Sequence, residues 1–213
     1  MDNLIKILPE YYPQYDLKFK ILFVGDVVGK SQLLYSAIRG TYEEYFTATV
    51  GFEFYTFNIN LVNKVIKLQI WDTCSAIQSR NLVMQFCGNA SLIIIVYSIE
   101  NKQNFINVSY WLNETKKHCG KDCKFFLVGN KMDLEYERAI TRKEAEEFAR
   151  KNNFAFFDEC SAKLGINTQN ILIQAAKILS SPFIPHLEEK IKKREEKIKK
   201  HLNNNNIANY ISY

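Results

Sequence analysis

The stretch that most constrains the fold of this chain is residues 20–34, which read KILFVGDVVGKSQLL. Its apolar start predicts a buried strand, which a loop bounded by Gly25 and Gly29 follows. Lys30 and Ser31 then open a predicted helix. In loops of this kind backbone N–H groups point at phosphate oxygens, the lysine reaches the outer phosphates, and the serine hydroxyl binds Mg²⁺. Because the helix dipole favours the same anion, the stretch predicts a strand–loop–helix unit that binds phosphate.

This loop is one residue shorter than the standard phosphate-binding motif. The motif has four residues between its first glycine and Gly-Lys-Ser, whereas only Asp26, Val27 and Val28 stand here. A shorter loop offers one fewer N–H group, and β-branched valines resist the positive φ that such loops often adopt. We therefore expect weakened phosphate binding, most of all for a γ-phosphate. The motif by itself also fits an ordinary strand-to-helix turn.

Length and composition indicate one domain with two extensions. The 213 residues predict a domain at 18–180, an N-terminal arm at 1–17, and a charged helical tail with an Asn-rich end at 181–213. The apolar fraction of 47% is ample for a core, and a net charge of +5 is too small to predict a nucleic-acid partner. No CxxC pair, secretory signal or membrane-length apolar run is present, so we expect a cytoplasmic protein with reduced thiols.

The pattern of apolar residues predicts alternating strands and helices. Predicted strands cover residues 18–24, 51–62, 64–71, 92–97, 124–128 and 155–159, and predicted helices cover 30–38, 102–118, 141–152 and 167–179. The second and third strands predict an antiparallel hairpin, and Thr141 and Glu144 form a capping box. We therefore expect an α/β fold, with a mostly parallel six-stranded sheet, one antiparallel strand and helices on both faces. Ligands of such sheets bind at the carboxyl ends of the strands.

Two motifs at strand ends point to the ligand. Asn130, Lys131 and Asp133 form an Asn-Lys-x-Asp sequence after the strand at 124–128, and Ser-Ala-Lys follows the strand at 155–159. With both motifs in place, residues 18–180 resemble the small GTPases of the Ras superfamily, and among them the Rab family. The resemblance implies a P-loop GTPase domain in which Asp133 accepts two hydrogen bonds from guanine. Each motif alone also fits a solvated turn, whereas the pair argues against an ATP-using enzyme.

The resemblance implies further roles. Asn130 would brace the loops, the stem of Lys131 would lie along the base, and the N–H of Ala162 would bind the guanine oxygen. Ser31, Thr49 and Asp72 would hold Mg²⁺, Asp72 through water. The implied nucleotide-binding residues are Gly25, Asp26, Val27, Val28, Gly29, Lys30, Ser31, Gln32, Tyr42, Thr49, Ser75, Asn130, Lys131, Asp133, Ser161, Ala162 and Lys163. Residues 42–57 and 73–87 would bind effector and regulator proteins.

The chain departs from the family in its second switch. Where the family has Ala-Gly-Gln, this chain has Cys74, Ser75 and Ala76. The family glycine gives its N–H to the γ-phosphate, which Ser75 can do only in a conformation open to a residue with a Cβ. The family glutamine orients the attacking water, and Ala76 has no polar side-chain atom. Lys30 can still stabilise the transferring phosphoryl group. Because the glutamine is missing, however, we expect hydrolysis to be very slow.

The C-terminal segment also departs from the family. No cysteine follows Cys160, so we expect no prenyl anchor of the Rab type. Residues 188–200 hold seven Lys/Arg against four Glu, a net of +3. The segment 186–202 therefore predicts a solvated charged helix, with weak contact to anionic membranes and a short coiled coil as alternatives.

Together these residues predict a Rab-like small GTPase that binds GTP and GDP with Mg²⁺ and regulates vesicle-mediated transport or signalling. It would be cytoplasmic or peripheral to endomembranes, without a prenyl anchor. The alternative is a pseudo-GTPase with lost or GDP-only nucleotide binding, which serves as a protein-interaction module.

Overall fold

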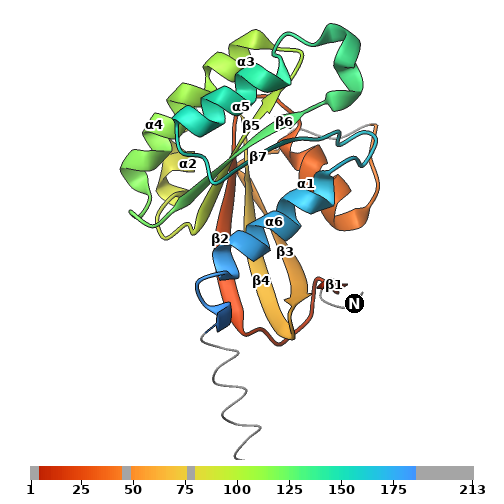
Figure 1. Ribbon diagram of the computed structural model, residues 1–213, viewed down its shortest axis with the longest axis vertical. Helices are drawn as coiled ribbons and strands as arrows, with labels where there is room; N and C mark the ends of the chain where they lie inside the picture. Colours follow the sequence, from red (N-terminus) through yellow and green to blue (C-terminus); the bar gives the residue numbers. More distant parts are fainter. Residues whose placement is uncertain (1–4, 45–48, 76–79, 186–213) are drawn as a thin grey trace, which may run out of the picture. The chain divides into compact units, whose positions relative to one another are not determined.

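The computed structural model describes residues 5–44, 49–75 and 80–185 (Figure 1). Its strands are β1 (Ile5–Leu8), β2 (Leu17–Val24), β3 (Phe52–Leu61), β4 (Lys64–Thr73), β5 (Leu92–Ser98), β6 (Lys124–Asn130) and β7 (Phe156–Glu159). They form one sheet in the order β1-β3-β4-β2-β5-β6-β7, in which β3 pairs antiparallel with both of its neighbours and the other pairings are parallel. The predicted α/β sheet and the predicted hairpin are confirmed.

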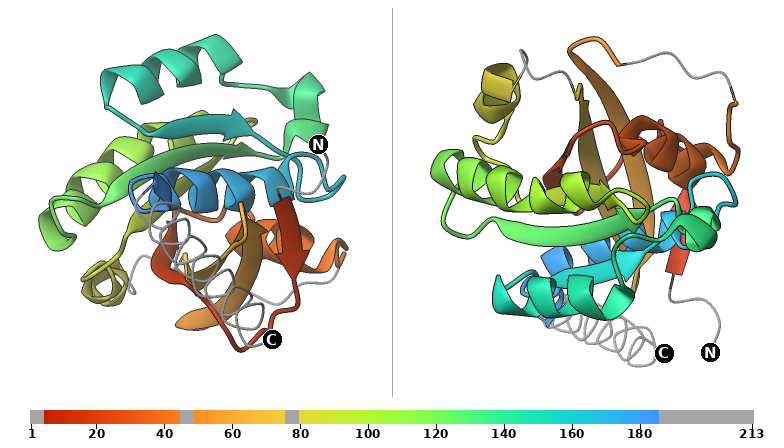
Figure 2. Two further views of the ribbon diagram at one scale, coloured as in Figure 1. Left: turned by 60° about the horizontal axis from the view of Figure 1, so that its bottom comes forward. Right: turned by 90° about the horizontal axis from the view of Figure 1, so that it is seen from above.

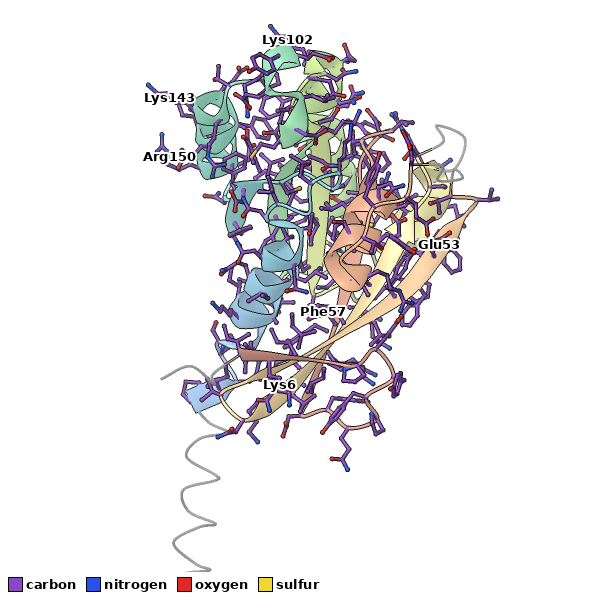
Figure 3. The ribbon with its side chains drawn as sticks, turned by 90° about the vertical axis from the view of Figure 1, so that its right-hand side faces the viewer. Lys6, Glu53, Phe57, Lys102, Lys143 and Arg150 are labelled. Carbon is purple, nitrogen blue, oxygen red and sulfur yellow. The ribbon has the colours of Figure 1, made fainter. Side chains whose placement is uncertain are left out.

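The prediction of six strands was wrong, because the described sheet has seven. The additional strand, β1, lies within the predicted N-terminal arm and pairs with β3 from Asn58 to Leu61. Figure 3 shows Lys6 of β1 beside the lower part of β3, with Phe57 and Glu53 farther along that strand. The buried Asn58 side chain donates to Pro9 O at 2.8 Å and so fixes the chain after β1. A four-residue strand is too short to show alternation, so only this long-range pairing reveals it.

The four predicted helical ranges are helical in the structure, which also has two helical segments that were not predicted, at 80–86 and 132–137. The helices are α1 (Lys30–Arg39), α2 (Arg80–Phe86), α3 (Lys102–Ile106), α4 (Val108–His118), α5 (Arg142–Lys151) and α6 (Thr168–Ser180), with a 3₁₀ helix, η2 (Met132–Glu137). The helix predicted at 102–118 is divided at Asn107, which ends α3 and precedes α4. At α5, the predicted cap is present, since the Thr141 hydroxyl accepts a hydrogen bond from the N–H of Glu144 at 3.2 Å.

Two apolar clusters fill the space between the sheet and its helices. One contains side chains of α1 and α6, and the other contains side chains of α2, α3, α4 and α5. In the right-hand view of Figure 2, α4 (green) and α6 (blue) lie on opposite sides of the sheet. All seven residues of β5 are buried, as predicted for a central parallel strand. This packing fixes the strand ends, from which the loops of the candidate site emerge.

The chain divides into two compact units, Met1–Leu179 and Ser180–Tyr213. β1 belongs to the sheet of the first unit. The basic segment 186–202 lies outside the described residues. Among the residues that are described, no helix combines the length and apolar character that a membrane span requires.

Candidate functional site

The shortened loop is built on two glycines with positive φ. Gly25 directly follows β2 and has a φ of 142°, and a Cβ there would lie 2.4 Å from the carbonyl oxygen of Val96. Gly29 precedes α1 with φ of 81°. Val27 and Val28 are not among the residues with positive φ; Val28 is buried in the core and Val27 is exposed. The glycines therefore carry the unusual conformations, and the valines are spared the strain that their branched side chains would cause.

The start of α1 presents unpaired N–H groups. The backbone N–H of Leu33 donates to Gly29 O at 2.9 Å, which closes the first turn. The N–H groups of Lys30, Ser31 and Gln32 have no acceptor among the described residues. Such groups at a helix start, together with the helix dipole, favour an anion.

Lys30 is almost completely buried beside this helix start, with 3% of its surface exposed. Its ammonium donates to Gly25 O at 2.8 Å, to Asp26 O at 3.1 Å and to the Ser75 hydroxyl oxygen at 2.6 Å. Burial lowers the pKa of Lys30 to about 8, and the nearby carboxylate of Asp72 opposes this shift. The three N–H donors of the ammonium are thus all used within the protein.

Asp26 is a structural hub that the sequence did not reveal. Its carboxylate accepts hydrogen bonds from Asn107 Nδ2 at 2.7 Å, Trp111 Nε1 at 3.1 Å and the Arg80 guanidinium at 3.2 Å. These partners come from α2, from α4 and from the junction between α3 and α4. The family resemblance placed Asp26 among the nucleotide-binding residues of the loop; its side chain ties that loop to helices far away in sequence. No local pattern pairs these residues, so only the packing of the helices brings them together.

The three predicted Mg²⁺ ligands lie together. The Ser31 hydroxyl is 2.7 Å from the Thr49 hydroxyl and also hydrogen-bonds to Asp72 Oδ2. The Thr49 hydroxyl lies 3.5 Å from the same carboxylate oxygen. Asp72 is fully buried, and its other oxygen, Oδ1, has no hydrogen-bond partner. Burial raises the pKa of Asp72 to about 6.

This donor set fits Mg²⁺ in its chemistry. One carboxylate and two hydroxyls are oxygen ligands, which hard cations prefer, and Mg²⁺ usually takes few protein ligands beside waters and phosphates. A cation would also compensate the buried charge and the unpaired oxygen of Asp72. The described residues contain no cluster of three or more His, Cys, Asp or Glu side chains.

A pocket of about 300 Å³ lies next to the phosphate loop. It is lined by Gly29, Gln32, Tyr42, Asn130, Lys131, Asp133, Leu134, Ala162 and Lys163. Asn130 holds its walls together, because Nδ2 donates to Val28 O at 2.9 Å and Oδ1 accepts from the N–H of Ala162 at 3.2 Å. The loops after β2, β6 and β7 thereby meet at one side chain.

Asp133 retains free acceptor capacity in this pocket. Its Oδ1 accepts from the Ser161 hydroxyl at 2.5 Å, and its Oδ2 has no donor among the described residues. Lys131 is a non-glycine residue with φ of 66°, and its ammonium pairs with Glu100 at 2.5 Å. The N–H of Ala162, which the resemblance assigns to guanine, here donates to Asn130.

The predicted partner-binding regions are described only in part. Ala76, the position of the family glutamine, lies outside the described residues, as do 45–48. At the entry to the first region, the side chain of Gln32 donates to the carbonyl of Glu43. The Phe52 ring lies 5.1 Å from that of Trp71, and 43% of Phe52 is exposed. An aromatic surface therefore joins β3 and β4 near the site.

Comparisons with known proteins agree with the fold and show the family of the chain. The family model described as "Ras family" matches residues 20–181. Ras-related protein SEC4 of Candida albicans is 35% identical over 178 residues, covering 83% of each chain. Ras-related protein Rab-10 of Diplobatis ommata is 36% identical over 163 residues, covering 76% of this chain and 81% of its own length. GTP-binding protein ypt3 of Schizosaccharomyces pombe is 39% identical over 173 residues, covering 79% and 80%.

Proposed function

Since this chain belongs to the Ras family of small GTPases and is Rab-like within it, we propose that it binds GDP and GTP with Mg²⁺ and regulates vesicle-mediated transport or signalling. The observation that carries this proposal is the continuity of one pocket. Its wall combines Asp133, Asn130 and Ala162 with Gly29, which precedes the start of α1. A ligand in this pocket would meet base-reading and phosphate-reading groups at the same time.

Asp133 would read the base. The free Oδ2 and the remaining lone pair of Oδ1 can accept the N1–H and amino hydrogens of guanine, a pair of donors that adenine lacks. Lys131 would lie along the base, held by its ion pair with Glu100. Tyr42, half exposed at the rim, would cover the edge of the base.

The phosphates would lie against the start of α1. The free N–H groups there and the ammonium of Lys30 favour an anion, and Ser31, Thr49 and Asp72 would hold Mg²⁺ beside it. Mg²⁺ bound there would neutralise charge on the phosphates. Hydrolysis would be very slow, because Ala76 cannot orient a water molecule.

A direct test is titration of the nucleotide-stripped protein with fluorescent GDP and GTP analogues, with Mg²⁺ and with EDTA. Mg²⁺-dependent binding that unlabelled GDP displaces and ADP does not would support the proposal. Absence of binding for both nucleotides would reject it. The Asp122→Asn variant, which changes an exposed carboxylate away from the pocket, serves as a control and should bind like the wild type.

One observation favours a second function, that of a pseudo-GTPase. The side chains of Lys30 and Ser31 already pair with groups of the protein itself, so these two side chains keep polar partners when no nucleotide is bound. Such a protein would act through its surface alone. Residues 42–57 and 73–87, with the exposed rings of Phe52 and Phe54, would then bind partners in a single conformation.

The same resemblance supports a proposal for the cellular location. We place the protein in the cytoplasm, in part at endomembranes, where residues 186–202 would add a weak contact with anionic lipid. Binding of the full chain to vesicles with and without anionic lipid, at low and high salt, tests this contact. Binding that persists at high salt would contradict an electrostatic origin.

A further inference from the structure

Three lysine side chains gather on the face of the sheet that carries the exposed aromatic rings. Lys18 of β2 lies directly opposite Lys67 of β4 in the parallel pairing of these strands. Lys20 follows two residues after Lys18 and so lies on the same face. Like charges that lie opposite each other on neighbouring strands destabilise a sheet. We call Lys18, Lys20 and Lys67 the lysine cluster.

The cluster has no carboxylate partner in the described part of the chain. None of its three lysines takes part in an ion pair there. The side chains beside it on the same face of the sheet are neutral, namely Thr56 and Asn58 of β3 and Gln69 and Trp71 of β4. In the connection from β1 to β2, Glu10 and Asp16 each pair with another cation. The positive charge of the cluster is therefore left without a neutralising group among these residues.

The ammonium groups of the cluster keep free hydrogen-bond donors. Lys20 Nζ donates to Gly88 O at 3.0 Å, and Lys67 Nζ donates to Tyr12 O at 3.2 Å. Within the described residues, Lys18 Nζ has no hydrogen-bond acceptor. Because an ammonium group has three N–H donors, each of the three lysines can still bind an anion.

Two aromatic rings position the cluster. The Tyr15 ring centroid lies 5.9 Å from Lys18 Nζ and 5.0 Å from Lys67 Nζ, so one ring attracts both ammonium groups. Lys20 Nζ lies 5.4 Å from the ring centroid of Trp71, which belongs to the aromatic surface of β3 and β4. The lysine cluster therefore continues that aromatic surface along the same face of the sheet.

We propose that the lysine cluster binds an acidic segment of a partner protein, whose apolar side chains lie on the adjoining aromatic surface. The inference rests on the proposed partner-binding role of residues 42–57 and 73–87, and it does not depend on nucleotide binding. Carboxylates of the segment accept from the free N–H donors and neutralise the opposed charges of Lys18 and Lys67. A cost within a sheet that no internal contact removes is expected at a functional surface.

The burial of the cluster favours a protein segment over a membrane. Lys18 is exposed, whereas Lys20 and Lys67 are only partly exposed. A narrow extended segment can follow the sheet to these two ammonium groups, which a flat lipid surface reaches less closely. Anionic lipid is therefore the competing ligand that the experiment has to exclude.

The test uses two short synthetic peptides, one of alternating glutamate and leucine and one of alternating glutamine and leucine. Each carries a rhodamine label, and fluorescence anisotropy measures its binding to the full chain. The acidic peptide should bind at least tenfold more tightly than the neutral one, and added salt should weaken its binding. The double variant Lys18→Gln with Lys67→Gln should weaken the binding about tenfold, the effect of two partly exposed charge contacts. Lys18→Arg with Lys67→Arg keeps both charges and should keep the affinity.

Lys143→Gln with Lys151→Gln is the matched control, since both lysines are exposed on α5 and the net charge changes by the same amount. It should bind the acidic peptide like the wild type. An equal loss in the two glutamine variants would overturn the inference, because net charge alone would then be the cause. Equal binding of the two peptides, or loss of binding in the arginine variant, would overturn it as well.

Vesicles with and without anionic lipid separate the two ligands. If the wild type binds anionic vesicles through Lys18 and Lys67 but does not bind the acidic peptide, the cluster is a membrane contact and the inference is wrong. Titration with GDP separates the inference from the proposed nucleotide binding. A wild type that binds the acidic peptide but no nucleotide would reject nucleotide binding and leave the inference standing.

Discussion

The two halves of the candidate site differ in how their polar groups are used. On the base side, Asp133 keeps one carboxylate oxygen without a donor, and the pocket around it is open. On the phosphate side, Lys30 has all its donors occupied by the protein, and Ser31 pairs with Asp72. On the base side a side-chain acceptor therefore stays free for a ligand, whereas on the phosphate side the ammonium of Lys30 and the hydroxyl of Ser31 are already paired within the protein, and the N–H groups at the start of α1 and Asp72 Oδ1 stay without a partner among the described residues.

The difference follows from how each half is held. The loops after β6 and β7 are held mainly by Asn130 and Ser161, close to the strands that carry them. The phosphate loop lacks one residue, and Asp26 instead ties it to α2 and α4. The phosphate loop is therefore held by side chains of distant helices, whereas the base-side loops are held by residues at the ends of their own strands.

The largest effect is expected from Asp133→Asn, which removes the carboxylate that would bind guanine. Loss of two hydrogen bonds to a charged acceptor should weaken GDP binding at least a hundredfold and shift preference toward xanthine nucleotides. Competition between GDP and XDP for a fluorescent analogue measures the shift. An unchanged preference would remove Asp133 from the base-reading role.

A smaller effect is expected from Asp26→Ala, which removes the carboxylate that ties the phosphate loop to the helices. Arg80, Asn107 and Trp111 would lose their common acceptor in a largely buried position, so the free energy of unfolding should fall by about 2–3 kcal/mol. Urea unfolding of the nucleotide-free protein measures this change. The matched variant Asp133→Ala should lose less than about 1 kcal/mol, because one hydroxyl donates to that carboxylate. If the free energy of unfolding fell equally in the two variants, the phosphate loop would not be held more firmly than the base-side loops, and the contrast between the two halves of the site would be refuted.

The smallest effect is expected from Ala76→Gln, which restores the polar side chain of the family. One hydrogen bond to the attacking water is worth about 1 kcal/mol, so single-turnover hydrolysis should speed up about fivefold. Rapid mixing of GTP-loaded protein with Mg²⁺ follows the rate. If the rate stays the same, the shortened phosphate loop rather than Ala76 limits the reaction.

Much of the fold could be predicted from local patterns. The apolar run of β5, the hairpin of β3 and β4 and the cap at Thr141 all depend on residues that are neighbours in sequence. The break at Asn107 was missed because both flanking segments are helical by pattern. β1 was missed because its pairing partner is some fifty residues away and its four residues carry little pattern.

By itself, the sequence determined the α/β sheet, the order of its loops and the types of side chain that face a ligand, because strand period, glycine positions and short motifs are local properties. Only the tertiary structure decided how those side chains are used. In the folded protein the Asp26 carboxylate accepts a hydrogen bond from Trp111, and the Ser75 hydroxyl accepts one from Lys30. Asp133 accepts a hydrogen bond at Oδ1 alone among the described residues. These outcomes depend on the packing of helices against a sheet, and the three contacts join residues that are 85, 45 and 28 positions apart.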